Sequence, residues 1–75
     1  MKKIIDGLLY DTDTAELIYF DESTKRRLYR ALKGRFFMMY PNGVITPKTD
    51  EETMRYLGER DVDKYIELFN EPEEA

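Results

Sequence analysis

The segment Phe36-Phe37-Met38-Met39-Tyr40 constrains the fold strongly, because it places a large side chain at five successive positions. In a β-strand successive side chains point to opposite faces, so Phe36, Met38 and Tyr40 would lie opposite Phe37 and Met39. Both faces of this strand would then be apolar, and both need cover from water. We therefore predict a central strand with a helix packed on one side and another element on the other.

Neighbouring segments predict the remainder of an antiparallel sheet. Residues 26–32 and 35–40 flank Lys33-Gly34 and have the form of a hairpin. Residues 16–20 are rich in strand-forming side chains. Residues 44–46 predict a short edge strand that Pro47 ends, because proline cannot donate to a sheet ladder.

The first residues predict a second, smaller hairpin over residues 2–10. Asp6-Gly7 separates two short apolar runs there, and glycine tolerates the positive φ that a type I′ turn demands. The run Asp11-Thr12-Asp13-Thr14 follows, and side chains of these types bond nearby backbone groups. We predict a turn that caps a single helical turn over residues 12–16.

After Pro47 the apolar period changes from that of a strand to that of a helix. Thr49 and Glu52 have the spacing of a capping box, which predicts a helix over residues 50–57 that Gly58 ends. Asp61 would cap a second helix, whose apolar stripe lies at positions i, i+3, i+4 and i+7. The expected fold is α+β: an antiparallel sheet of three or more short strands, in two hairpins, with two short C-terminal helices packed on one face. The apolar stripe of the second helix consists of Val62, Tyr65, Ile66 and Phe69. Residues 71–75 are expected to fray.

The 75 residues predict one domain, in which folding buries only about 60% of the surface of the unfolded chain. The chain has neither cysteine nor histidine. Disulfides, zinc sites with the usual ligands and Cys or Ser/His nucleophiles are therefore excluded. We expect no enzymatic activity, metal or cofactor. No apolar run is long enough to span a membrane, and Asp6-Gly7 follows the start too early for a signal peptide, which predicts an intracellular protein.

Positive charge gathers between residues 25 and 35, which hold six basic and no acidic side chains. Basic side chains beside exposed aromatics can contact phosphates and stack bases, and alternation lets Arg27, Tyr29 and Phe37 share a face. The other interpretation is that the aromatics are core and the cations protect a strand edge. The candidate residues of this basic hairpin are Lys25, Arg26, Arg27, Tyr29, Arg30, Lys33 and Arg35.

Negative charge gathers at the other end of the chain. Residues 1–48 hold nine basic and six acidic side chains and residues 49–75 hold three and ten, which together give the formal net charge of −4. Such carboxylates can occupy a cationic nucleic-acid channel on another protein, or they are a solvated helix face with acids favoured near helix N-termini. The candidate residues of this acidic surface are Asp50, Glu51, Glu52, Glu59, Asp61, Asp63 and Glu67.

Four segments together resemble a family of small proteins from phages and mobile elements of Gram-positive bacteria. They are KKIIDGLLYDTDTAELI at 2–18, LYRALKGRFFMMYPNG at 28–43, ITPKTDEETMRYL at 45–57 and DVDKYIELF at 61–69. Typical members begin Lys-Lys-Ile-Ile-x-Gly-x-x-Tyr-Asp-Thr-x-Thr-Ala and end in acidic helices. Related domains occur in or beside anti-CRISPR proteins, including the N-terminal part of some inhibitors of type II-A CRISPR nucleases.

The resemblance implies a non-enzymatic inhibitor that binds a CRISPR effector nuclease or its guide-RNA complex in the cytoplasm of a bacterial host. It supplies no catalytic residues. The contact would be made by the acidic surface, in the manner of a DNA mimic, or by the basic hairpin. Two alternatives remain open at this point: a small nucleic-acid-binding or regulatory protein that acts through residues 25–35, and an assembly protein of the mobile element. We expect the protein to be a monomer or a homodimer. We expect no membrane partner.

Overall fold

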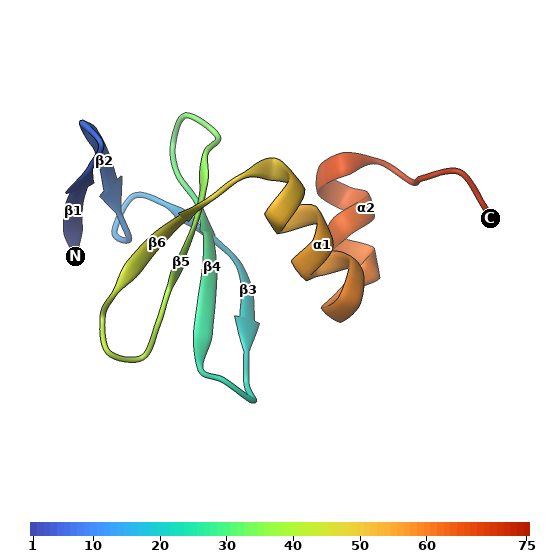
Figure 1. Ribbon diagram of the computed structural model, residues 1–75, viewed down its shortest axis with the longest axis horizontal. Coiled ribbons are helices and arrows are strands. Elements are labelled where there is room, and N and C mark those ends of the chain that lie inside the picture. Colours follow the sequence, from blue (N-terminus) through green and yellow to red (C-terminus); the bar gives the residue numbers. More distant parts are fainter.

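A four-stranded antiparallel sheet lies at the centre of the computed structural model, which describes residues 1–75 (Figure 1). Its strands follow the order β3-β4-β5-β6, and β1 and β2 form a separate two-stranded sheet. Two helices complete the chain, so the predicted α+β class is confirmed. The elements are β1 (Lys2–Ile5), β2 (Leu8–Asp11), β3 (Glu16–Asp21), β4 (Arg26–Arg30), β5 (Phe36–Met39), β6 (Ile45–Lys48), α1 (Asp50–Arg60) and α2 (Val62–Phe69).

The strand β5 is an interior strand covered on both faces, as its sequence predicts. Phe36 and Met38 lie with Leu28 in a cluster that packs against Leu57 of α1. Phe37 points the other way and packs with Tyr10 of β2, with ring centroids 5.4 Å apart and an interplanar angle of 76°. We call these sides of the sheet the helix face and the hairpin face (Figure 1).

The element that covers the hairpin face is the predicted N-terminal hairpin. Ile5 pairs with Leu8 across the turn, where Asp6 and Gly7 have φ values of 51° and 76°. A type I′ turn requires this left-handed backbone at both central residues. The hairpin extends one residue further than predicted, since Asp11 pairs with Lys2.

A bulge in β3 directs two consecutive side chains to the helix face. Leu17 pairs with Tyr29, but the next pair is Tyr19 with Leu28, so Ile18 is the extra residue. Ile18 lies in the helix-face core and Tyr19 packs on Tyr56, with ring centroids 5.9 Å apart. The bulge therefore places two side chains under α1 where strict alternation would supply one.

The prediction that Gly58 ends the first helix is wrong. The helix α1 continues to Arg60, and Asp61 ends it, donating its backbone N–H to the Leu57 carbonyl at 2.7 Å. A glycine cap needs a left-handed backbone, and Gly58 is not among the glycines with positive φ. The last turn is retained because Arg60 reaches Asp21 at the end of β3, with Nε and Oδ2 3.4 Å apart.

Three shorter segments also differ from expectation. Residues 12–15 form the predicted single turn, closed by an i→i+4 bond from the Ala15 N–H to the Asp11 carbonyl at 3.0 Å, but the turn is one residue shorter than predicted because β3 begins at Glu16. The edge strand β6 includes Pro47, because an edge strand leaves one side without sheet partners. The hairpin strand β4 ends at Arg30, and Leu32 lies in the loop with 80% of its surface exposed.

The helices dock on the helix face of the sheet through part of the predicted apolar stripe. Phe69 of α2 packs on Phe36 at 5.7 Å between ring centroids, and Tyr65 and Leu68 border the same cluster. Val62, also predicted for the stripe, is exposed. Neither helix has the length and apolar character needed to cross a membrane. Residues 70–75 follow α2 without regular structure and extend away from the sheet (Figure 1).

Candidate functional site

All seven residues of the predicted acidic surface lie on α1, on α2 or at their junction, but two of them are bonded into helix caps. The Thr49 N–H donates to Glu52 Oε1 at 3.0 Å, and the Glu52 N–H donates to Thr49 Oγ1 at 3.1 Å. The donation from Thr49 holds the pKa of Glu52 below its usual value. Asp61 accepts from the Lys64 N–H at 3.1 Å. Glu52 and Asp61 therefore stabilise the helices that carry the acidic surface.

The other five acidic residues differ in their ion pairs. Glu59 lies 3.4 Å from Arg60 Nη1, and Glu67 lies 2.8 Å from Lys64 Nζ, which raises the pKa of Lys64 through that hydrogen bond. The remaining three are exposed and make no ion pair with any basic side chain. Folding thus leaves a smaller set of unpaired carboxylates on the helices, which we call the free carboxylates: Asp50, Glu51 and Asp63.

The predicted basic hairpin is divided by the sheet that it helps to form. Arg26 and Arg30 lie on the helix face, where their guanidinium groups stand over Tyr40 and Phe36 at 4.8 and 5.7 Å. Arg27 lies on the hairpin face, 4.8 Å over the ring of Phe20. The remaining cations lie beyond the ends of β4, in the loops on either side of it: Lys25, Lys33 and Arg35.

The aromatic residues of this hairpin also differ from exposed stacking platforms. Tyr29 pairs with Phe37 and stacks on it, with centroids 5.2 Å apart and planes 12° from parallel, so the predicted shared face is confirmed. Phe37 is fully buried, and Tyr29 is half-buried. No broad basic surface with exposed rings results, although none of the six hairpin cations makes an ion pair.

A polar cluster that the sequence reading missed fixes α1 to the end of β3. Asp21 is 6% exposed and accepts from Ser23 Oγ at 2.6 Å, from the Ser23 N–H at 3.0 Å and from Tyr56 Oη at 3.0 Å. These donors, the Ser23 hydroxyl above all, hold the pKa of Asp21 well below its usual range. Burial, together with donation to Asp21, raises the pKa of Tyr56 to about 12.

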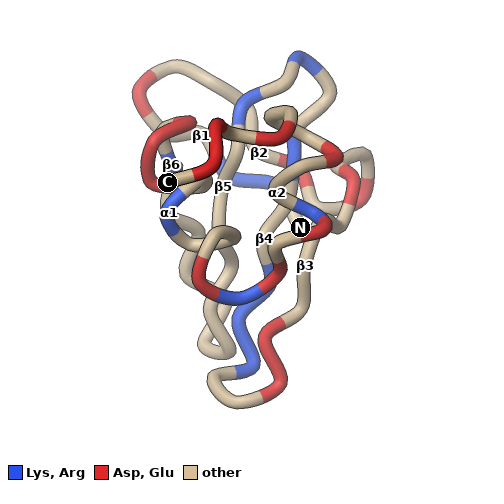
Figure 2. Tube along the Cα trace, turned by 90° about the vertical axis from the view of Figure 1, so that its right-hand side faces the viewer, with Lys and Arg blue, Asp and Glu red and all other residues tan.

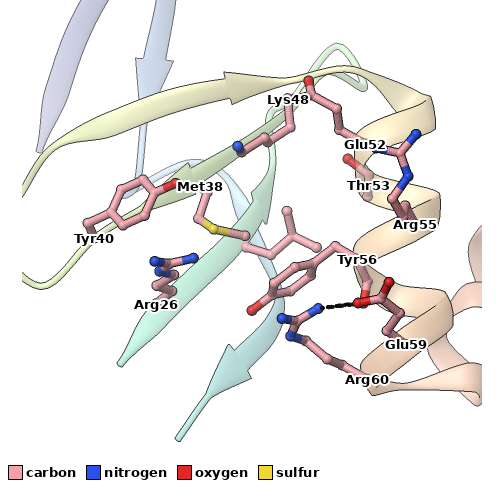
Figure 3. Close-up of a pocket in the computed structure, with 11 residues that line it drawn as sticks. Arg26, Met38, Tyr40, Lys48, Glu52, Thr53, Arg55, Tyr56, Glu59 and Arg60 are labelled. Atoms are coloured by element: carbon pink, nitrogen blue, oxygen red, sulfur yellow. Dashed lines mark hydrogen bonds and ion pairs between the residues drawn. The ribbon is translucent and has the colours of Figure 1, made fainter. Parts of the chain in front are cut away.

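Beside this cluster lies a groove between α1 and the helix face of the sheet, with a volume of about 220 Å³ (Figure 3). We call it the helix-face groove. Its floor is formed by Leu28 and Met38, and α1 supplies Thr53 and Tyr56 to its wall. Two acidic and four basic residues line it: Glu52, Glu59, Arg26, Lys48, Arg55 and Arg60.

The four cations of the helix-face groove are not equivalent. Arg60 is held by Asp21 and Glu59 and stands 4.1 Å over the ring of Tyr56. Arg26, Lys48 and Arg55 make no ion pair. Only Arg26 belongs to the predicted basic hairpin, because the groove joins strands and a helix that are distant in sequence.

Comparison of the chain with protein-family models, with curated proteins and with solved structures found no match. Figure 2 shows the separation of charge along the backbone, with basic residues along β4 and acidic residues along the C-terminal tail.

Proposed function

We propose that this protein is a non-enzymatic inhibitor that binds a CRISPR effector nuclease or its guide-RNA complex and blocks target-DNA binding or cleavage. Its place of action would be the cytoplasm of a bacterial host. The observation that carries the proposal is the set of free carboxylates on two capped helices, Asp50, Glu51 and Asp63, with three further glutamates in the tail. The resemblance to proteins of phages and mobile elements supplies the class of partner.

The physical basis is electrostatic competition for a DNA-binding channel. A channel that binds DNA is lined by cations and attracts any ordered array of negative charge. Asp50 and Glu51 lie in the first turn of α1 and Asp63 in that of α2, so the caps at Thr49 and Asp61 hold their backbone in place. Fixed carboxylates lose less conformational entropy on binding than carboxylates on a disordered chain.

The acidic surface is a better contact than the basic hairpin for this function. The hairpin cations are distributed over both faces of β4 and the loops beyond it, so a flat partner would meet only part of them. The free carboxylates lie on helices that share one end of the molecule. We therefore assign the partner contact to α1, α2 and the tail.

The test is inhibition of DNA cleavage by purified effector–guide complexes, including a type II-A nuclease. We expect wild-type protein to inhibit at least one effector, and the double variant Glu51→Lys/Asp63→Lys to inhibit at least about tenfold less, since close interfacial charges contribute more than 1 kcal/mol each. The matched control is Asp13→Lys/Glu22→Lys, which makes the same charge change at exposed positions outside the helices. Full inhibition by a folded Glu51→Lys/Asp63→Lys variant would contradict the assignment of the contact.

The alternative function is a small nucleic-acid-binding or regulatory protein that acts through residues 25–35. The observation that favours it is that all six cations of this hairpin lack an acidic partner within the molecule. It predicts direct binding of labelled RNA or DNA, with an affinity that falls steeply as salt rises. Absence of a mobility shift at low salt would rule this function out.

A further inference from the structure

Three donor groups from three different parts of the sheet point into the helix-face groove. Arg26 comes from β4, Tyr40 follows β5, and Lys48 ends β6. Figure 3 shows Arg26 and Lys48 on either side of Met38, with their charged ends directed into the groove, and the Tyr40 hydroxyl directed toward Met38. On the helix face of β5, Met38 lies between Phe36, which pairs with Lys48 of β6, and Tyr40, over whose ring the Arg26 guanidinium stands.

None of these three groups makes an ion pair or a side-chain hydrogen bond within the protein, and the one contact between them is the Arg26 guanidinium over the Tyr40 ring. Arg26 and Lys48 make no ion pair, and the Tyr40 hydroxyl makes no hydrogen bond. The Glu52 carboxylate, which also lines the groove, accepts from the Thr49 N–H, and the charge of Lys48 contributes to its lowered pKa. Arg26, Tyr40 and Lys48 are half-buried, so part of their hydration is already lost and an entering anion interacts with them in a medium of lower polarity than water.

We infer that the helix-face groove binds the phosphate-ester group of a ligand, with Arg26, Lys48 and the Tyr40 hydroxyl as donors. A phosphate presents oxygens in several directions, which suits donors that arrive from separate strands. A carboxylate has two coplanar oxygens, which suit the fork of a single arginine. The groove volume of about 220 Å³ accommodates a phosphate and part of the group that it esterifies.

The groove recognises the phosphate and not a base. The guanidinium of Arg26 covers the ring of Tyr40 at 4.8 Å, and that of Arg60 covers the ring of Tyr56 at 4.1 Å. Both rings therefore have a face occupied by the protein's own cation, whereas sequence-independent binding of single strands uses open aromatic faces. The ligand is a small phosphorylated molecule or a nucleic-acid strand with a terminal phosphate. Glu52 and Glu59 of the acidic surface also line this groove, but the free carboxylates do not, and the site does not depend on the proposed inhibition.

The experiment is a titration of ¹⁵N-labelled protein followed by amide chemical shifts. The probes are inorganic phosphate, ribose 5-phosphate, an oligothymidylate with a 5′-phosphate, the same oligothymidylate with a 5′-hydroxyl, and succinate. We expect saturable shifts around residues 26, 40 and 48 with the phosphate-bearing probes, and binding at least about tenfold weaker with succinate and with the 5′-hydroxyl strand. Preference for ribose 5-phosphate identifies a small molecule, and preference for the phosphorylated strand identifies a nucleic-acid end.

Variants separate the groove from general charge attraction. Arg26→Gln/Lys48→Gln should weaken binding at least about tenfold, while the control Lys33→Gln/Arg35→Gln, with the same loss of charge in the β4–β5 loop, should change it less than about twofold. Tyr40→Phe keeps the ring under Arg26 and removes only the hydroxyl, so it tests the site without loss of packing. Absence of saturable shifts, equal binding of succinate, or equal weakening by the control pair would each overturn the inference.

Discussion

The helix face and the hairpin face of the sheet are covered by different kinds of contact. On the helix face, Leu57 of α1 is fully buried, and Asp21 accepts a hydrogen bond from Tyr56 and forms an ion pair with Arg60. On the hairpin face, the cover is a two-stranded hairpin that packs Tyr10 against Phe37. Both faces bury apolar area, but the helix face also holds groups whose ionisation is displaced by folding. The comparison predicts that the packing of α1 on the helix face depends on pH more strongly than the packing of the N-terminal hairpin on the hairpin face.

The largest effects should come from the two side chains that anchor these faces. Phe37→Ala should lower the free energy of unfolding by about 3–5 kcal/mol, and Leu57→Ala by about 2–5 kcal/mol, since each side chain is fully buried and leaves a cavity. Urea denaturation measures both. Leu32→Ala, at an exposed loop position, is the control and should change the value by less than about 0.5 kcal/mol. If either buried variant lowers the free energy of unfolding only slightly, that side chain does not anchor its face of the sheet.

The next effect concerns Asp21 and acid. Because folding lowers the pKa of Asp21, the ionised carboxylate stabilises the protein above about pH 4, and this stability is lost as pH falls further. Asp21→Asn should therefore destabilise the protein at pH 7 and make its stability less dependent on pH between about 4 and 2. Denaturation at several pH values tests this, with Glu22→Gln as the exposed neighbour control. An unchanged acid dependence in Asp21→Asn would show that the cluster does not link α1 to β3.

Tyr56 tests the same cluster at alkaline pH, because folding raises its pKa whereas folding lowers that of Asp21. Folding raises the pKa of Tyr56 to about 12, so its stabilising effect is complete below about pH 10 and is lost as pH rises toward 12. Tyr56→Phe should cost about 1 kcal/mol at pH 7 and flatten the loss between pH 10 and 12. The matched control is Tyr29→Phe on the hairpin face. If both variants change the alkaline dependence equally, the two faces do not differ in this respect.

The smallest effect tests the corrected boundary of α1. Gly58→Ala should stabilise the protein by about 0.5–1 kcal/mol, because glycine is unfavourable within a helix and the added Cβ would lie 3.8 Å from Tyr65 Cδ2. Gly34→Ala is the contrasting change, since Gly34 has a φ of 98° and should lose stability on substitution. Thermal unfolding compares the two. Destabilisation by Gly58→Ala would show that the helix ends before residue 58.

The sequence predicts the features that depend on local pattern. Alternation along residues 36–40 identified an interior strand, and the Thr49–Glu52 spacing identified the start of α1. It does not predict the bulge at Ile18, because a bulge is set by pairing with β4. Gly58 misled the helix boundary because a glycine signal is local, whereas the last turn of α1 is held by Asp21, 39 positions before Arg60.

The charged residues show the same limit. Alternation along β4 sends Arg26 and Arg27 to opposite faces, as the sequence pattern allows, but it does not show which other segments meet each of them. The helix-face groove combines Arg26, Tyr40 and Lys48 from three segments, and no pattern within one segment relates them. Pairing of the strands and docking of α1 determine this groove, so it follows only from the folded structure.

The most direct test of the proposed inhibition is whether the protein and target DNA exclude one another on an effector–guide complex. Labelled target DNA is bound to a nuclease-inactive effector, including a type II-A nuclease, and wild-type protein is added while fluorescence anisotropy is followed. Competition for a cationic channel predicts release of the DNA in proportion to protein bound, with Glu51→Lys/Asp63→Lys releasing much less and Asp13→Lys/Glu22→Lys behaving as wild type. A stable complex that holds both protein and DNA, or no binding to any effector, would contradict the account.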